Sequence, residues 1–128
     1  MRAFKNTWFN RFAEKEAIQN SELLAMVNRI EAGHAEANLG GGVFKERVAR
    51  PGAGKSGGYR VILFFKSGDR AFFVYGFTKS ARGNISRKEL RAYKEAAKDY
   101  LRMTDEQINE RIARGQLIEI GGGHEKTI

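Results

Sequence analysis

Apolar residues recur at helical spacing in two segments near the start of the chain. The pattern predicts helices over residues 7–16 and 21–32. Gly33 is placed to end the second, because glycine readily adopts the left-handed conformation found after helices. Residues 2–5 are predicted as a short edge strand. The two apolar faces consist of Trp8, Phe9, Phe12 and Ala13 in the first helix, and Leu23, Met26, Val27 and Ile30 in the second.

Three later segments have the pattern of β-strands. Residues 43–49 alternate, so Lys45 and Arg47 share one face. Residues 59–66 (YRVILFFK) and 70–78 (RAFFVYGFT) are rich in β-branched and aromatic residues, and the intervening Ser-Gly-Asp favours an antiparallel hairpin. Because both are apolar on both faces, we expect them to be central strands with helices on one side.

The last third of the chain carries two helix-start signals. Ser86 and Glu89 have the spacing of a capping box, in which each side chain accepts a hydrogen bond from the other residue's backbone amide. Thr104 and Gln107 repeat this spacing for a shorter helix that ends near residue 114. Residues 117–120 can add one more short strand.

These elements predict an α+β fold, a small antiparallel sheet with an N-terminal helical pair and C-terminal helices packed on it. We expect one domain over residues 1–120 and a disordered tail over residues 121–128. No apolar run approaches the ~18–20 residues that span a bilayer. Residues 1–6 lack the apolar region of a signal peptide. A cytoplasmic protein without a membrane partner is therefore expected.

Positive charge is concentrated in the middle of the chain. The formal net charge is +8, and residues 43–99 hold 14 Lys and Arg against 5 Asp and Glu. A localised basic excess is typical of proteins that bind a polyanion, such as RNA, DNA, an anionic membrane surface or an acidic protein. The ordinary alternative is a solvated surface whose charge maintains solubility.

Several familiar chemistries are disfavoured. The chain has no cysteine, which excludes disulfides, thiolate metal sites and a cysteine nucleophile. His34 and His124 have no partner at metal-ligand spacing, so we predict no metal and no cofactor. The sequence Gly54-Lys55-Ser56 resembles the end of a phosphate-binding P-loop, but a strand follows it where a P-loop needs a helix.

Cations with aromatic neighbours remain as candidate functional residues. Antiparallel pairing of the hairpin strands places residues 59–60 and 77–79 at the same end of the sheet, where the glycine-rich loop of Lys55 also ends. A single cation at a strand end is ordinarily solvated, whereas several from distant segments are typical of a phosphate-binding surface. The candidates are Lys45, Arg47, Lys55, Arg60, Arg70, Tyr75, Lys79 and Arg82.

Several segments resemble the RelE/ParE toxin superfamily, and within it the HigB-like branch. The most specific are SGGYR at residues 56–60 and FVYGFTK at residues 73–79. LGGGVFKER at residues 39–47 and Asn84-Ile85 before a helix add to the similarity. It extends from about Phe4 to Ile120, with the elements in the same order.

The resemblance implies the toxin of a type II toxin–antitoxin module. RelE-like members inhibit translation by cutting mRNA in the ribosomal A site without a metal ion, through attack of the 2′-hydroxyl on the adjacent phosphate. The implied partners are a cognate antitoxin of the helix-turn-helix type, the ribosome and mRNA. The resemblance extends to functional positions of the family at Lys45, Arg47, Arg60, Lys79 and Arg82. Together with the candidates above, the predicted catalytic residues are Arg60, Lys79, Lys45, Arg47 and Tyr75, and the predicted RNA-binding residues are Lys55, Tyr59, Arg70 and Arg82.

One position departs from the family pattern. RelE has a tyrosine shortly after its last strand that stacks on a base, whereas residues 83–86 here read GNIS. Tyr75 and Tyr59 are the candidates to replace it. Three functions stay open: a ribosome-dependent endoribonuclease, which leads, a ParE-like inhibitor of DNA gyrase, and a non-catalytic nucleic-acid-binding module.

Overall fold

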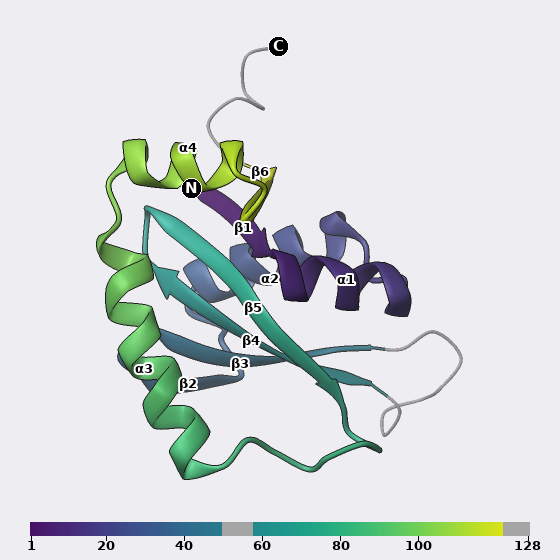
Figure 1. Cartoon of the computed structure of the whole chain (residues 1–128). Coiled ribbons are helices and arrows are strands. Elements are labelled where there is room, and N and C mark those ends of the chain that lie inside the picture. Colours follow the sequence, from purple (N-terminus) through teal and green to yellow (C-terminus); the bar gives the residue numbers. More distant parts are fainter. Residues whose placement is uncertain (50–57, 122–128) are drawn as a thin grey trace.

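The computed structural model describes residues 1–49 and 58–121 (Figure 1). A six-stranded sheet in the order β2-β3-β4-β5-β1-β6 forms its centre. No helix within these described ranges is both long and apolar enough to cross a membrane. The strands are β1 (Arg2–Asn6), β2 (Ala37–Gly40), β3 (Val43–Val48), β4 (Tyr59–Lys66), β5 (Arg70–Thr78) and β6 (Leu117–Gly121). The helices are α1 (Thr7–Glu16), α2 (Asn20–Glu31), α3 (Arg87–Arg102) and α4 (Asp105–Ala113).

The predicted α+β class is confirmed, and α1, β4 and β5 have the predicted bounds. Three details of the prediction were wrong. Strand β1 is not at an edge but lies between β5 and β6, and it runs parallel to β5. Strand β2 was not predicted at all. Helices cover both faces of the sheet, which explains why β4 and β5 are apolar on both sides.

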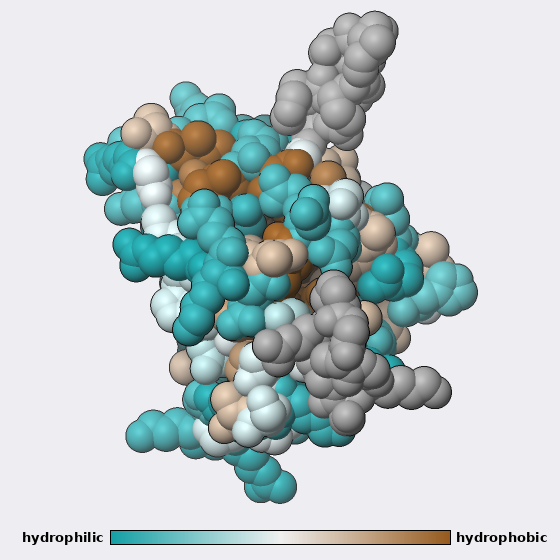
Figure 2. Space-filling model, turned by 90° about the vertical axis from the view of Figure 1, so that its right-hand side faces the viewer, coloured by the Kyte–Doolittle hydropathy of each residue, from teal (hydrophilic) through white to brown (hydrophobic). Residues whose placement is uncertain are grey.

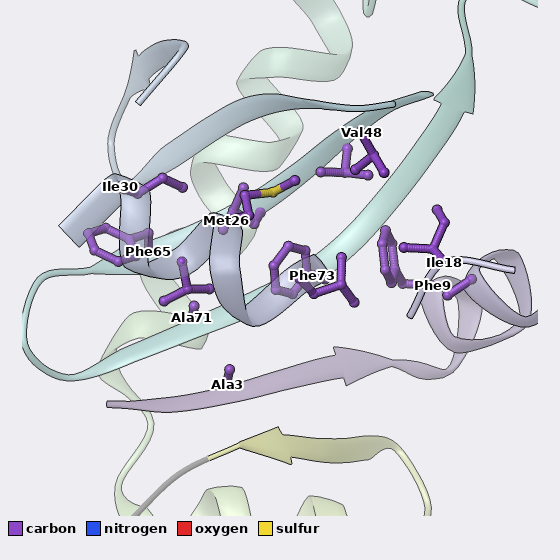
Figure 3. Packing of buried hydrophobic residues seen from close by; sticks show 14 of the residues in the cluster. Ala3, Phe9, Ile18, Met26, Ile30, Val48, Phe65, Ala71 and Phe73 are labelled. Carbon is purple, nitrogen blue, oxygen red and sulfur yellow. The ribbon is translucent and has the colours of Figure 1, made fainter. Parts of the chain in front are cut away.

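Each face of the sheet has its own hydrophobic core. On one face, α1 and α2 pack Phe9, Met26 and Ile30 against Phe65 and Phe73 (Figure 3). On the other, α3 and α4 pack against a second set of strand residues. That second core includes Phe4, Ile62, Phe64, Phe72, Ala97 and Ile108. The sheet is therefore a rigid layer whose side chains are fixed by packing from both directions.

The predicted caps are present and set where the helices begin. The Asn6 side chain accepts a hydrogen bond from the Phe9 amide at 2.7 Å. Ser86 and Glu89 form the expected box at the start of α3, and Thr104 does the same with its partner at α4. These contacts satisfy backbone amides that have no partner within the helix.

The turn between β2 and β3 depends on glycine. Gly41 and Gly42 have φ of +62° and +83°, a region that residues with a Cβ rarely adopt. A Cβ added at Gly42 would also lie 2.5 Å from Cδ1 of Leu101. The glycines allow α3 to pack closely on this turn.

Candidate functional site

Two rows of side chains cross β3, β4 and β5 on the face of the sheet that carries α3. Residues directly opposite on neighbouring antiparallel strands have Cβ atoms about 4.5–5.5 Å apart. The first row consists of Lys45, Ile62 and Tyr75, and the second consists of Arg47, Arg60 and Phe77. We call Lys45, Arg47, Arg60, Tyr75 and Phe77 the cationic face.

A β-bulge brings the aromatic members to this face. Leu63 pairs with Phe73 and Ile62 pairs with Tyr75, so Val74 is an extra residue in β5. Without it, Phe73 and Tyr75 would share the α1 and α2 side, because side chains alternate along a strand. Bulges often redirect side chains in this way next to functional sites.

Arg60 is the central cation of the second row. It is half-buried, and its Nη1 is a buried nitrogen without a hydrogen-bond partner among the described residues. A buried donor left unsatisfied costs about 1–3 kcal/mol, and more when it is charged. Its cross-strand neighbour Arg47 is exposed and also a cation. The pair is therefore suited to bind an anionic oxygen.

Arg82 reaches the same face from the segment between β5 and α3. Its guanidinium forms a bidentate ion pair with Glu89, with Nη1–Oε2 at 3.0 Å and Nη2–Oε1 at 2.5 Å. Nη1 also donates to the Tyr75 hydroxyl at 3.3 Å, and Cζ lies 5.5 Å from the centroid of the Phe77 ring. Hydrogen bonding to Arg82 lowers the pKa of Glu89 to about 2. The positive charge of Arg82 is thus largely compensated by the Glu89 carboxylate, and its guanidinium positions the Tyr75 hydroxyl.

Lys45 is the β3 member of the first row, and Lys79 follows the end of β5 beyond the second row. The Lys45 ammonium donates to Oδ1 of Asn84 at 3.1 Å. Lys79 is exposed just after β5, where its backbone amide donates to the Gly58 carbonyl at 3.4 Å. This contact confirms that the end of β5 lies beside the start of β4. Within the described ranges, no hydrogen bond or ion pair involves the Lys79 side chain.

Two predicted residues are not brought to the cationic face. Tyr59 is buried on the α1 and α2 side and donates to Oε1 of Glu16 at 2.8 Å. Arg70 is buried at the opposite end of β5, where it donates to the Met103 carbonyl and lies 3.8 Å from Asp105. Residues 50–57 of the glycine-rich loop, Lys55 among them, lie outside the described residues, as do residues 122–128 of the tail expected to be disordered. Gly121, the first residue of that predicted tail, is instead the last residue of β6.

Three residues near the cationic face were not among the candidates. Asn84 holds Lys45, and Glu89 holds Arg82 in addition to capping α3. Trp8 was assigned to the apolar stripe of α1, but its residue is 43% exposed and its ring centroid lies 4.7 Å from that of Tyr75. Of the four residues in that stripe, only Phe9 and Ala13 are buried, a distinction that the structure shows and the apolar spacing does not.

The cationic face, in which Arg47 is exposed and Lys45, Arg60 and Tyr75 are half-buried, is distinct from the hollow found between α3 and α4. That hollow is lined by residues such as Tyr100, Met103 and Gln107 with charges of both signs, at the far end of α3. In Figure 2 the brown, most hydrophobic residues lie in the upper half of the molecule, whereas teal hydrophilic residues lie in both halves and are interspersed with white and pale tan ones in the lower half.

Guanidinium and ammonium groups on a rigid sheet, beside oriented tyrosines, can bind phosphate oxygens and stabilise negative charge that develops on them. Tyr93 lies behind Tyr75, with ring centroids 6.1 Å apart. Burial raises the pKa of Tyr93 to about 12, so its hydroxyl stays protonated at neutral pH.

The comparisons agree with this architecture. A family model described as the RelE toxin of the RelE / RelB toxin-antitoxin system matches residues 1–120. The chain therefore belongs to the RelE toxin family. Its role is that of the toxin in a toxin–antitoxin system, which implies an antitoxin partner. A comparison with curated proteins gives no match.

Proposed function

We propose that this toxin is a ribosome-dependent endoribonuclease that inhibits translation by cutting mRNA without a metal ion. The observation that carries the proposal is the pair of half-buried Arg60 and exposed Arg47, directly opposite each other on β4 and β3, with no ion-pair partner for either among the described residues. An RNA phosphate supplies the negative charge that these two guanidinium groups lack. The HigB-like branch remains a prediction.

The proposed reaction uses the RNA's own 2′-hydroxyl as nucleophile. Its oxygen bonds to the adjacent phosphorus as the bond from phosphorus to the 5′-oxygen breaks, which leaves a 2′,3′-cyclic phosphate and a 5′-hydroxyl. The 2′ proton is lost and the 5′-oxygen gains one. Negative charge accumulates on the non-bridging phosphate oxygens, where fixed cations give the largest stabilisation.

Each residue of the site then has a role. Arg60 and Lys79 clamp the phosphate from adjoining strand ends, and Lys45 and Arg47 lie beside them. The Tyr75 hydroxyl, held by Arg82 at 3.3 Å, is the candidate for proton transfer. Because these roles need only side chains on β3, β4 and β5 and the segment that follows, no cofactor is required.

The antitoxin is proposed to cover the same surface. An acidic, partly disordered segment attached to a helix-turn-helix domain would neutralise the cationic face and compete with RNA for it. Co-purification with the product of the adjacent reading frame, lost at high salt, is the expected result. Failure of the two to co-purify at low salt would contradict it.

Induced expression of Arg60→Ala tests the catalytic assignment, with primer extension on cellular mRNA as the measurement. The wild type should give codon-associated cuts and growth arrest. Arg60→Ala should lower the cleavage rate on programmed ribosomes by about 10²–10³-fold, the effect of removing one preorganised donor. Arg60→Lys should recover part of it, because one charge is retained without the planar fork.

Arg114→Ala is the matched control. Arg114 is the exposed residue directly after α4, and its 3.3 Å contact with Glu110 is an ordinary surface pair, so cleavage should be unchanged. Full arrest and cleavage by folded Arg60→Ala would refute the assignment. Intact mRNA with DNA damage after wild-type induction would favour gyrase inhibition instead.

A further inference from the structure

Trp8 is an exposed aromatic residue beside the cationic face. It is the one tryptophan of the chain. Its ring stacks on Phe12 of the same helix, with centroids 5.4 Å apart and an interplanar angle of 15°. It also meets Tyr75 at 4.7 Å and 31°. The side chain is therefore held in place while 43% of the residue stays exposed.

The end of β1 explains why Trp8 lies there. Strand β1 pairs with β5 only as far as Phe73, and the Asn6 side chain then donates to the Val74 carbonyl at 3.2 Å. Helix α1 begins at the next residue and runs beside the part of β5 that β1 leaves uncovered. The bulge at Val74 thus coincides with the end of the β1 pairing, and just beyond it Tyr75 lies against Trp8.

Tyr75 connects Trp8 to the charged groups. Its ring contacts the indole, and its hydroxyl accepts from Arg82. Across the sheet, Tyr75 belongs to the row that contains Lys45. An exposed aromatic plane bordering a cationic surface is the combination used by proteins that bind single-stranded nucleic acid, in which bases stack and phosphates are paired with cations.

We propose that Trp8, supported by Tyr75, forms the binding site for one unpaired nucleobase of a single-stranded RNA whose phosphates lie on the cationic face. The inference rests on the proposed function, in that it takes RNA as the ligand, and adds a subsite from α1 to it. The indole loses little conformational freedom on binding, because it is already stacked and has only two side-chain torsions.

The fluorescence of Trp8 provides a direct test, since the chain has no other tryptophan. Two short, dye-labelled 2′-O-methyl oligoribonucleotides serve as probes, because they cannot be cut by 2′-hydroxyl attack. One carries all its bases and the other is abasic at its central positions, with the same number of phosphates. Fluorescence anisotropy measures binding of both at low salt, and indole emission measures stacking.

The base-containing probe should quench Trp8 emission and the abasic probe should bind more weakly without quenching. Trp8→Ala should weaken the base-containing probe about tenfold, as expected for loss of one stacked base. It should leave the abasic probe unaffected. Trp8→Phe, the matched variant that keeps a ring, should restore most of the affinity. Thermal melts establish that each variant is folded.

Equal binding of the two probes without quenching would overturn the base subsite, while the proposed phosphate-binding surface would stand. Absence of binding by either probe at low salt would overturn the RNA-binding surface and the subsite with it. A loss of affinity that Trp8→Ala shows equally for both probes would also contradict the subsite, because the abasic probe offers no base to stack.

Discussion

Arg47 and Arg60 lie directly opposite each other on β3 and β4. Like charges in this arrangement destabilise a sheet by about 0.2–1 kcal/mol, and no acid within the described residues forms an ion pair with either of them. The protein thus tolerates an unfavourable pair at the point where the proposed function needs an anion to bind. Removing one of the two charges should therefore raise the free energy of unfolding and weaken the binding of an anion.

Arg47→Gln should raise stability and weaken RNA binding. We expect a gain of about 0.2–1 kcal/mol in the free energy of unfolding at low salt, because the repulsion is removed and the side-chain stem is kept. The gain should shrink as salt screens the wild-type repulsion. Urea unfolding at two salt concentrations measures it. A variant less stable than wild type at low salt would show that Arg47 is compensated in the folded protein.

Gly76→Ala should destabilise the protein through α1. A Cβ added at Gly76 would lie 2.4 Å from Cε2 of Phe12, so a packed aromatic ring has to move. Overpacking of this kind costs about 1–3 kcal/mol. Gly83→Ala is the matched control, because nothing lies within 4 Å of its added Cβ. Equal melting temperatures for the two variants would contradict the close approach of Phe12 to β5.

Glu46→Gln should stabilise the protein at neutral pH. Glu46 is 1% exposed; its Oε2 accepts from the Glu36 amide at 2.7 Å, whereas its Oε1 has no hydrogen-bond partner among the described residues. Burial raises the pKa of this carboxyl. The neutral amide can still accept from Glu36 and avoids a buried charge, so we expect a gain on the order of 1 kcal/mol.

The sign of the pH dependence follows from the raised pKa. A carboxyl that binds its proton more tightly when folded favours folding below its unfolded pKa of about 4.3, and this contribution is lost as pH rises through the folded pKa. The advantage of Glu46→Gln should therefore be small at pH 4 and largest at neutral pH. Thermal melts of both proteins between pH 4 and 8 check it. A constant difference would mean that Glu46 titrates normally.

Periodicity predicted most elements because their side chains are sorted cleanly between core and solvent. Strand β2 was not predicted because it has only four residues, ends in glycine and shows almost no alternation of apolar and polar positions. The interior position of β1 in the sheet was not predicted because its two partner strands, β5 and β6, lie far from it in the sequence. The residue types within a strand do not indicate which distant strand it pairs with.

The arrangement of the candidate residues was predicted only where it depends on local pattern or on hairpin pairing. Alternation correctly placed Lys45 and Arg47 together, and hairpin pairing placed Arg60 near Lys79. The bulge at Val74 moves the Tyr75 side chain to the face of the sheet opposite to the one that simple alternation from Phe73 predicts. No residue pattern in β5 indicates this bulge. Arg70 looked like a free cation because its acceptors, the Met103 carbonyl and Asp105, come from a distant segment.

The pairing of β1 with β6 has a consequence for the timing of toxin maturation. Arg2 and Glu119 are joined by a 2.9 Å ion pair although 117 positions separate them. At about 5–20 residues per second, a ribosome needs on the order of ten seconds to make what lies between. Strand β6 can therefore pair with β1 only after it has left the exit tunnel of the ribosome that made it, and until then β5 is the one strand of the final sheet that can pair with β1.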